Sequence, residues 1–288
     1  MKKLFKFMFL FLLIFSLTGC LKRDTMEDIS IYTTNYPTTY IAERLYGKFS
    51  DIKSIYPNGS NINDYSLTEK QIKDYSKGDL FIFNGLSKEK KYVTKMRREN
   101  RDLKIIDTTL YMEYSHDMSE LWLDPSNFLM MAQNVKTGLR EYIDSYYLNS
   151  KISSNYEKLK IEASNLDAKI KDIVSNADNK VIVTSNTLFK YLEKYGLTVY
   201  VLDENDSNID ITSNEVIKLF KNGDIKYIFI KNDEEENTLI KNFVSSYGAT
   251  VQKWRTLSNI SEIEASENQD YFSIMNDNLE LLKNELYN

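Results

Sequence analysis

Short apolar runs alternate with amphipathic segments along most of the chain. The runs have the length and the β-branched and aromatic content of buried strands, and the segments between them repeat apolar residues at helical spacing. The runs cover residues 29–33, 51–56, 80–83, 104–107, 180–184, 197–202, 226–230 and 250–253. Strands that alternate with helices favour an α/β fold built on parallel sheets.

Three sequence signals predict where helices begin. Thr68 and Gln71 have the spacing of a capping box, and so do Thr212 and Glu215. Asp124 precedes Pro125, which suits an N-cap followed by a first helical position that needs no N–H donor. We expect this helix to cover residues 125–146.

A polar segment at residues 153–176 carries one narrow apolar stripe at spacings of three and four, as expected for a helix that lies across two lobes. The sequence thus predicts two lobes, each a mostly parallel sheet flanked by helices, joined by one long helix. The expected bounds are an N-terminal lobe at 29–147, a linking helix at 148–178 and a C-terminal lobe at 179–288.

The N-terminus has the pattern of an export signal. Lys2, Lys3 and Lys6 flank an apolar run at residues 7–17, which is too short for a permanent transmembrane helix of about 20 residues. The run ends in Leu-Thr-Gly-Cys at residues 17–20, which resembles the lipobox of bacterial lipoproteins. We therefore expect a signal peptide at 1–19, a lipid on Cys20, a tether at 20–28, and an extracytoplasmic protein anchored to membrane lipid.

Composition and motifs exclude several classes of function. Cys20 is the only cysteine, which rules out intramolecular disulfides and Cys-based metal sites. The net charge of −5 offers no basic surface for nucleic acid. No phosphate-binding loop or serine nucleophile motif occurs, and His116 stands alone in an expected exposed loop, so we expect no catalytic residues and no enzyme.

Several strings, in order along residues 29–286, resemble the metal-binding lipoproteins of zinc and manganese ABC importers. They are Asn35-Tyr36-Pro37, Pro57-Asn58-Gly59 with Asp64-Tyr65, the sequence DLFIFNGL at 79–86, Trp122-Leu123-Asp124-Pro125, Phe189 and Tyr191 with Tyr195-Gly196-Leu197, and the closing helix at 271–286. The resemblance implies a monomeric two-lobed receptor that presents its cargo to an ABC permease.

The resemblance also places a divalent ion between the lobes, but the residues at its ligand positions are different. Asn63, Glu120 and Asn186 stand where the family has histidines, and Arg255 stands where it has a late carboxylate. Zinc prefers imidazole and thiolate ligands. A dication 4 Å from a guanidinium would be opposed by about 8 kcal/mol at an effective dielectric of 20. We therefore expect neither zinc nor manganese as a cofactor at this position.

Three interpretations of these four residues remain open. In one hypothesis Arg255 replaces the metal and pairs with Glu120 while the two asparagines surround them. In another they are solvated rim residues of a decayed cleft, which suits a non-transport surface protein, adhesin-like or accessory. In the third, Arg255 binds an organic carboxylate, and the protein is a receptor for a small organic ligand.

Overall fold

The computed structural model describes residues 26–113 and 120–287, so Cys20 and His116 lie outside the described residues. Within these ranges, none of the helices combines the length and the apolar character that crossing a membrane requires.

The N-terminal lobe is built on four parallel strands in the order β2-β1-β3-β4. Its elements are β1 (Ile29–Thr33), α2 (Tyr36–Tyr46), the 3-10 turn η1 (Gly47–Phe49), β2 (Ser50–Ser54), α3 (Glu69–Tyr75), β3 (Leu80–Phe83), α4 (Lys90–Glu99) and β4 (Lys104–Asp107). All four side chains of β3 are buried, because Leu80 and Ile82 contribute to one core cluster while Phe81 and Phe83 contribute to another that includes α3 and α4.

The C-terminal lobe repeats this arrangement with four parallel strands in the order β6-β5-β7-β8. Its elements are β5 (Val181–Thr184), the 3-10 helix η3 (Thr187–Tyr195), β6 (Thr198–Val201), α7 (Ile209–Asn222), β7 (Tyr227–Lys231), α8 (Thr238–Tyr247) and β8 (Thr250–Trp254). The predicted fold class, with two parallel-sheet lobes flanked by helices, is confirmed.

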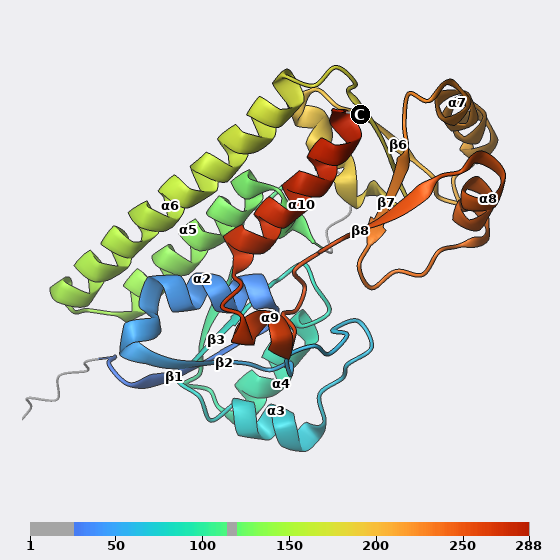
Figure 1. Cartoon of the computed structure of the whole chain (residues 1–288). Helices are drawn as coiled ribbons and strands as arrows, with labels where there is room; N and C mark the ends of the chain where they lie inside the picture. Colours follow the sequence, from blue (N-terminus) through green and yellow to red (C-terminus); the bar gives the residue numbers. More distant parts are fainter. Residues whose placement is uncertain (1–25, 114–119, 288) are drawn as a thin grey trace, which may run out of the picture.

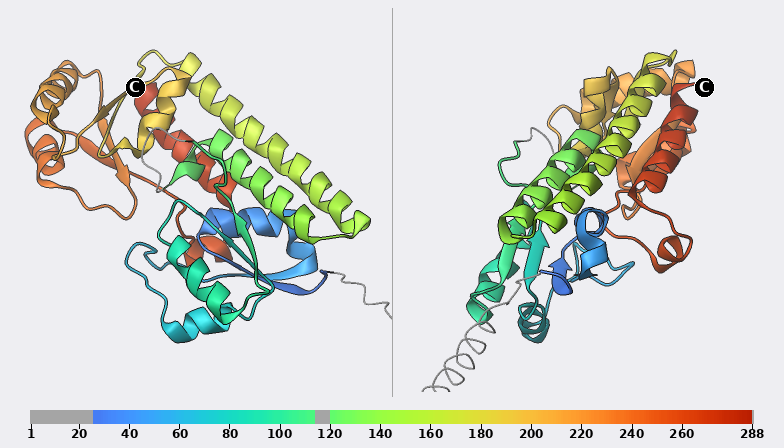
Figure 2. Two further views of the ribbon diagram at one scale, coloured as in Figure 1. Left: turned by 180° about the vertical axis from the view of Figure 1, so that it is seen from behind. Right: turned by 90° about the vertical axis from the view of Figure 1, so that its left-hand side faces the viewer.

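Long helices connect the two sheets. They are α5 (Pro125–Tyr142), preceded by the short turn η2 (Leu121–Leu123), then α6 (Tyr146–Ser175) and, after the short α9 (Glu262–Ser266), the closing helix α10 (Tyr271–Leu286). Helix α6 packs against both α5 and α10 along the length of the molecule (Figures 1 and 2). The largest core cluster continues through these helices from one sheet to the other, so the lobes share one apolar interior.

Two of the three predicted helix starts are confirmed, and the third is wrong. The capping box at Thr68 and Gln71 is present, and the Asp124 carboxylate accepts the Ser126 N–H at 2.8 Å as the N-cap of α5. The predicted helix start at Thr212 is wrong. A turn at Asp206, whose carbonyl accepts the Ile209 N–H, starts α7 earlier, and Thr212 lies inside the helix.

The break between α5 and α6 also differs from the prediction. Helix α5 ends at Tyr142 rather than 146, and Ser145 caps a new helix by accepting the Leu148 N–H at 3.3 Å. The acidic run at 233–236 precedes α8, because Asn237 accepts the Ile240 N–H and sets the helix start at Thr238.

Candidate functional site

A pocket of about 190 Å³ lies where the two lobes meet. It is formed by the chain after β2, the chain after β7 and the segment that leaves β8, which are all carboxyl ends of parallel strands, the edge where α/β proteins bind ligands. Its lining residues are Gly59, Ser60, Asn61, Ile62, Asn232, Asp233, Arg255, Thr256, Ser258, Asn259 and Ser261.

Backbone and amide hydrogen bonds connect the lobes beside this pocket. The Gly59 N–H donates to the Ile260 carbonyl at 2.9 Å. Asn259 Nδ2 donates to the carbonyl oxygens of Pro57 and Ser60, each at 2.8 Å. The loop after β2 is therefore attached to the segment after β8 by direct hydrogen bonds.

Glu120 is almost completely buried, at 2% exposure, just before η2. Its Oε1 lies 3.5 Å from the Nζ of Lys231, the last residue of β7, so a charge pair crosses from one lobe to the other. The one carboxylate among the four predicted site residues thus has an ammonium group as its neighbour.

Asn186 is turned toward its own lobe. Its Oδ1 accepts the Leu188 N–H at 3.0 Å as the N-cap of η3, and its Nδ2 donates to Glu234 Oε2 at 3.1 Å. The same Glu234 oxygen accepts hydrogen bonds from Ser185 Oγ at 2.7 Å and from the Lys231 N–H at 3.1 Å. Asn186 and Glu120 are therefore linked indirectly, through Glu234 and Lys231.

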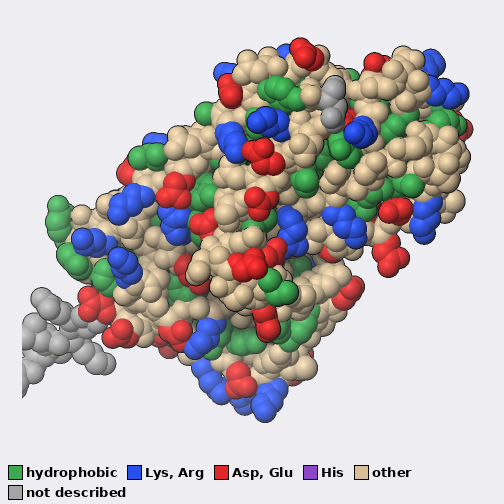
Figure 3. Space-filling view, in the orientation of Figure 1, with side chains coloured by type: hydrophobic (Ala, Val, Ile, Leu, Met, Phe, Trp, Pro, Cys, Tyr) green, Lys and Arg blue, Asp and Glu red, His purple; other side chains and the backbone are tan. Residues whose placement is uncertain are grey.

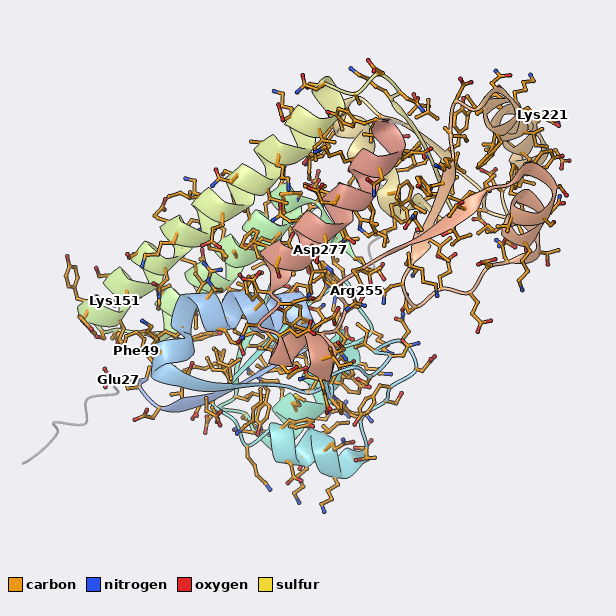
Figure 4. All side chains as sticks on the ribbon, in the orientation of Figure 1. Glu27, Phe49, Lys151, Lys221, Arg255 and Asp277 are labelled. Atoms are coloured by element: carbon orange, nitrogen blue, oxygen red, sulfur yellow. The ribbon has the colours of Figure 1, made fainter. Side chains whose placement is uncertain are left out.

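Arg255 has a different partner from the predicted one. Its Nη2 donates to Glu264 at 2.6 Å, so the hypothesis of a pair between Arg255 and Glu120 needs correction. The physical reason is local: a capping box between Ser261 and Glu264 at the start of α9 holds the Glu264 carboxylate beside the guanidinium. Figure 4 shows Arg255 at the junction of the lobes.

The electrostatics of Glu264 reflect this contact. Burial raises the pKa of Glu264, but the hydrogen bonds from the Ser261 N–H and Oγ and the charge of Arg255 outweigh burial, so its pKa lies below the usual value. The side chain of Asn278 also binds the backbone of Arg255: its Oδ1 accepts the backbone N–H at 3.0 Å, and its Nδ2 donates to the carbonyl oxygen at 2.8 Å. Arg255 is consequently fixed at the pocket wall by its backbone and its side chain.

Asn63 is exposed and its side chain is not part of the pocket lining, although Asn61 and Ile62 are. Its carbonyl accepts a hydrogen bond from Lys88 Nζ at 2.5 Å. The four predicted residues thus do not form one cluster: Glu120 and Asn186 share a network, Arg255 belongs to a second, and Asn63 lies outside both.

Residues 26–113 and 120–287 contain no group of three or more His, Cys, Asp or Glu side chains placed to hold a metal ion. The sequence interpretation missed Lys231, Glu234 and Glu264. Lys231 carries a usable signal, because it is a charged residue at the carboxyl end of a buried strand, where α/β sites are built. The pairing of Glu264 with Arg255 has no comparable signal.

Comparison with known proteins supports the resemblance. The family model described as "Zinc-uptake complex component A periplasmic" matches residues 31–285. The manganese ABC transporter substrate-binding lipoprotein PsaA of Streptococcus pneumoniae is 24% identical over 315 residues, which cover 97% of each chain.

Solved structures show the same fold. The metal-dependent lipoprotein YcdH of Bacillus subtilis superposes with a TM-score of 0.74 at 19% identity, covering 90% of this chain and 99% of that one. The laminin-binding protein Lbp of Streptococcus pyogenes gives a TM-score of 0.71 at 19% identity, covering 90% and 99%.

Proposed function

The chain belongs to the family of the periplasmic zinc-uptake component A, and from this premise we propose that it is a membrane-anchored extracytoplasmic solute-binding lipoprotein that works beside an ABC permease. The match spans nearly the whole chain and the similarity to PsaA covers 97% of both sequences, which supports a receptor with the same two-lobed body. The string at residues 17–20 supports anchoring through a lipid on Cys20.

The proposal includes a cleft that does not bind zinc in the usual way. The observation that carries it is the 3.5 Å contact between Lys231 Nζ and the buried Glu120 carboxylate. An ammonium group opposes a dication by about 8 kcal/mol at 4 Å and an effective dielectric of 20. Asn186, which is engaged with Glu234, supplies no imidazole to offset this repulsion.

A second candidate function is a receptor for a small organic ligand. The pocket of about 190 Å³ is lined mostly by amide and hydroxyl side chains, together with the charged Arg255 and Asp233. Arg255 Nε is buried and has no hydrogen-bond partner among the described residues. A site with convergent polar groups of both charges suits a small zwitterionic or carboxylate-bearing solute.

Calorimetry tests the metal part of the proposal. Zinc and manganese are titrated separately into the mature chain, and we expect no binding in the nanomolar range for either ion. A nanomolar affinity for zinc would overturn the proposed cleft chemistry.

A thermal-shift screen of amino acids and small organic acids tests the organic-ligand candidate. A ligand at 100 times its Kd stabilises the folded state by about 2.7 kcal/mol. The response should be lost in Arg255→Met and kept in Arg140→Met, whose side chain is exposed on α5. If no compound shifts the melting temperature, the accessory surface role is favoured over transport of a small organic solute.

Anchoring is tested in cells with Cys20→Ser. We expect the wild-type chain in the membrane fraction with a lipid mass on its N-terminal peptide, and the variant in the soluble fraction. A wild-type N-terminal peptide without a lipid would contradict the anchor.

A further inference from the structure

Two exposed tyrosines and the partly buried Phe49 form an aromatic group at one end of the molecule. Tyr146 is 89% exposed and Tyr147 57% exposed at the start of α6, and the Tyr147 ring meets Phe49 of η1 edge-on, with centroids 6.3 Å apart. Lys151 Nζ lies 5.4 Å from the centre of the Tyr147 ring. We call Phe49, Tyr146 and Tyr147, with Lys151, the aromatic tip.

The aromatic tip is directly attached to the beginning of the described chain. The Asp28 N–H donates to the Phe49 carbonyl at 2.9 Å, and Tyr46 Oη donates to the Met26 carbonyl at 2.5 Å. The Tyr46 and Phe49 rings lie 5.6 Å apart. Figure 4 places Glu27, Phe49 and Lys151 at the same end of the molecule, and Figure 3 shows hydrophobic side chains gathered there.

Covalent geometry limits how far this end can lie from the membrane. Cys20 precedes Met26 by six residues, and an extended chain covers at most about 3.5 Å per residue, or roughly 20 Å in all. A lipid on Cys20 therefore keeps the aromatic tip close to the bilayer surface.

The chemistry of the tip suits the interfacial layer of a membrane more than a charged surface. Tyrosine is enriched at membrane–water interfaces because its ring is apolar and its hydroxyl remains hydrated. The exposed charges around the tip are of both signs, with Lys48 and Lys151 near Glu27, Asp28 and Asp144. Among these described residues, positive charges do not outnumber negative ones, so electrostatics alone does not account for an attraction to anionic lipid.

We propose that the aromatic tip inserts into the headgroup layer of the membrane that carries the Cys20 anchor, a proposal that rests on the anchored location proposed above. The lipid gives one point of attachment and the tip gives a second, so the protein has a preferred orientation. The tip lies at the amino end of the N-terminal sheet, whereas the pocket lies at the carboxyl ends of the strands. The pocket consequently faces away from the surface that holds the tip.

Tryptophan substitution tests the contact without depending on lipidation in the cell. The mature chain is coupled through its single cysteine, Cys20, to a maleimide lipid in vesicles of phosphatidylcholine. Tyr146→Trp is compared with Tyr111→Trp, since Tyr111 is 91% exposed but follows the carboxyl end of β4. The native Trp122 and Trp254 are at most 1% exposed and give a constant background.

In vesicles containing brominated lipid, we expect the added emission of Tyr146→Trp to shift to the blue and to be quenched about twofold, with Tyr111→Trp unchanged. The same result is expected when an anionic lipid is added. Equal behaviour of the two variants would overturn the proposal, and quenching that appears only with anionic lipid would overturn its aromatic basis. Because the tether is chemical, either failure is distinct from absence of a natural lipid on Cys20.

Discussion

The ammonium nitrogen of Lys231 lies 3.5 Å from a carboxylate oxygen of Glu120, and the contact joins the two lobes of the molecule. Glu120 is 2% exposed, whereas the Lys231 side chain is 23% exposed. A buried carboxylate needs a compensating charge, because desolvation disfavours its ionised form. Lys231 thus has the neutralising role that the sequence interpretation assigned to Arg255.

Removal of this compensating charge should destabilise the fold. We expect Lys231→Met to lower the free energy of unfolding by about 2 kcal/mol at pH 7, less than the 3–5 kcal/mol for a fully buried partner because Lys231 is partly solvated. The double variant Glu120→Gln with Lys231→Met should recover most of the loss. Urea unfolding followed by circular dichroism measures both.

The matched control is Lys77→Met. Lys77 pairs with Asp74 at 2.6 Å, but the two side chains are 69% and 48% exposed. Exposed pairs of this kind contribute between about 0 and 1 kcal/mol. Equal losses of unfolding free energy in Lys231→Met and Lys77→Met would show that the contact with Glu120 stabilises the fold no more than an exposed ion pair does.

The parts of the fold that the sequence predicted depend on short-range patterns. Runs such as residues 80–83 are apolar throughout because they are buried on both faces, and the caps at Thr68 and Asp124 use residues within three positions. The break at residues 143–145 was predicted a few residues too late, because Ile143 and Leu148 are both buried and apolar residues continue from α5 into α6.

The site was harder to predict because its contacts join distant parts of the sequence. Glu120 and Lys231 come from different lobes, and the sequence alone does not fix how the lobes approach each other. Arg255 was identified as a wall residue of the cleft, but its choice of Glu264 over Glu120 depends on where α9 places a carboxylate. Residue identity gives the side chains that stand at the four positions, and packing determines which partners they contact.

Replacing Gly138 by alanine should destabilise the fold, although alanine is the better helix former. A Cβ built on Gly138 would lie 2.6 Å from Ile106 Cγ1, because α5 packs closely on β4. We expect Gly138→Ala to cost between about 1 and 3 kcal/mol of unfolding free energy through overpacking. Thermal unfolding should show a fall of several degrees in Tm.

Gly47→Ala is the control for this effect. Gly47 has φ −57°, and its nearest neighbour to a new Cβ would be Glu43 Cβ at 3.6 Å, an ordinary contact. Its Tm should stay the same or rise slightly, since alanine reduces the freedom of the unfolded chain. A Gly138→Ala variant as stable as Gly47→Ala would refute the close packing of α5 on β4.

Tyr271 should be a major source of stability at the start of α10. Its ring stacks on Phe128 with centroids 3.9 Å apart, and its Oη donates to the Trp122 carbonyl at 2.6 Å. We expect Tyr271→Ala to cost about 4 kcal/mol through the cavity. Tyr271→Phe keeps the ring and should cost about 1 to 2 kcal/mol, because the buried carbonyl loses its donor.

Urea unfolding separates these two contributions, with Tyr287→Phe as the reference. Tyr287 Oη donates to the Ile173 carbonyl at 2.9 Å, but the residue is 45% exposed, so water replaces the hydroxyl. Tyr287→Phe should lower the free energy of unfolding by no more than about 0.5 kcal/mol. Equal effects of Tyr271→Phe and Tyr271→Ala would contradict the role of ring stacking.

The buried carboxyl group of Glu285 should make the stability of the protein depend on pH. Glu285 is 1% exposed, and burial raises its pKa to about 7 from an ordinary 4.5, although the N–H groups of Lys226 and Tyr227 lower it. The folded state therefore holds this proton more tightly than the unfolded chain. The contribution to stability is complete below pH 4.5 and decreases as the pH rises to about 7, by about 3 kcal/mol in total.

Glu285→Gln removes the charge and keeps an acceptor for the N–H groups of Lys226 and Tyr227. The free energy of unfolding is measured with urea between pH 5 and pH 8 for both proteins. The value for the variant relative to the wild type should increase by about 2 kcal/mol from the lower to the higher pH. Glu280→Gln, at a 58% exposed side chain, should follow the wild-type curve. If the difference between Glu285→Gln and wild type is constant with pH, Glu285 is ionised in the folded state throughout, and the raised pKa is wrong.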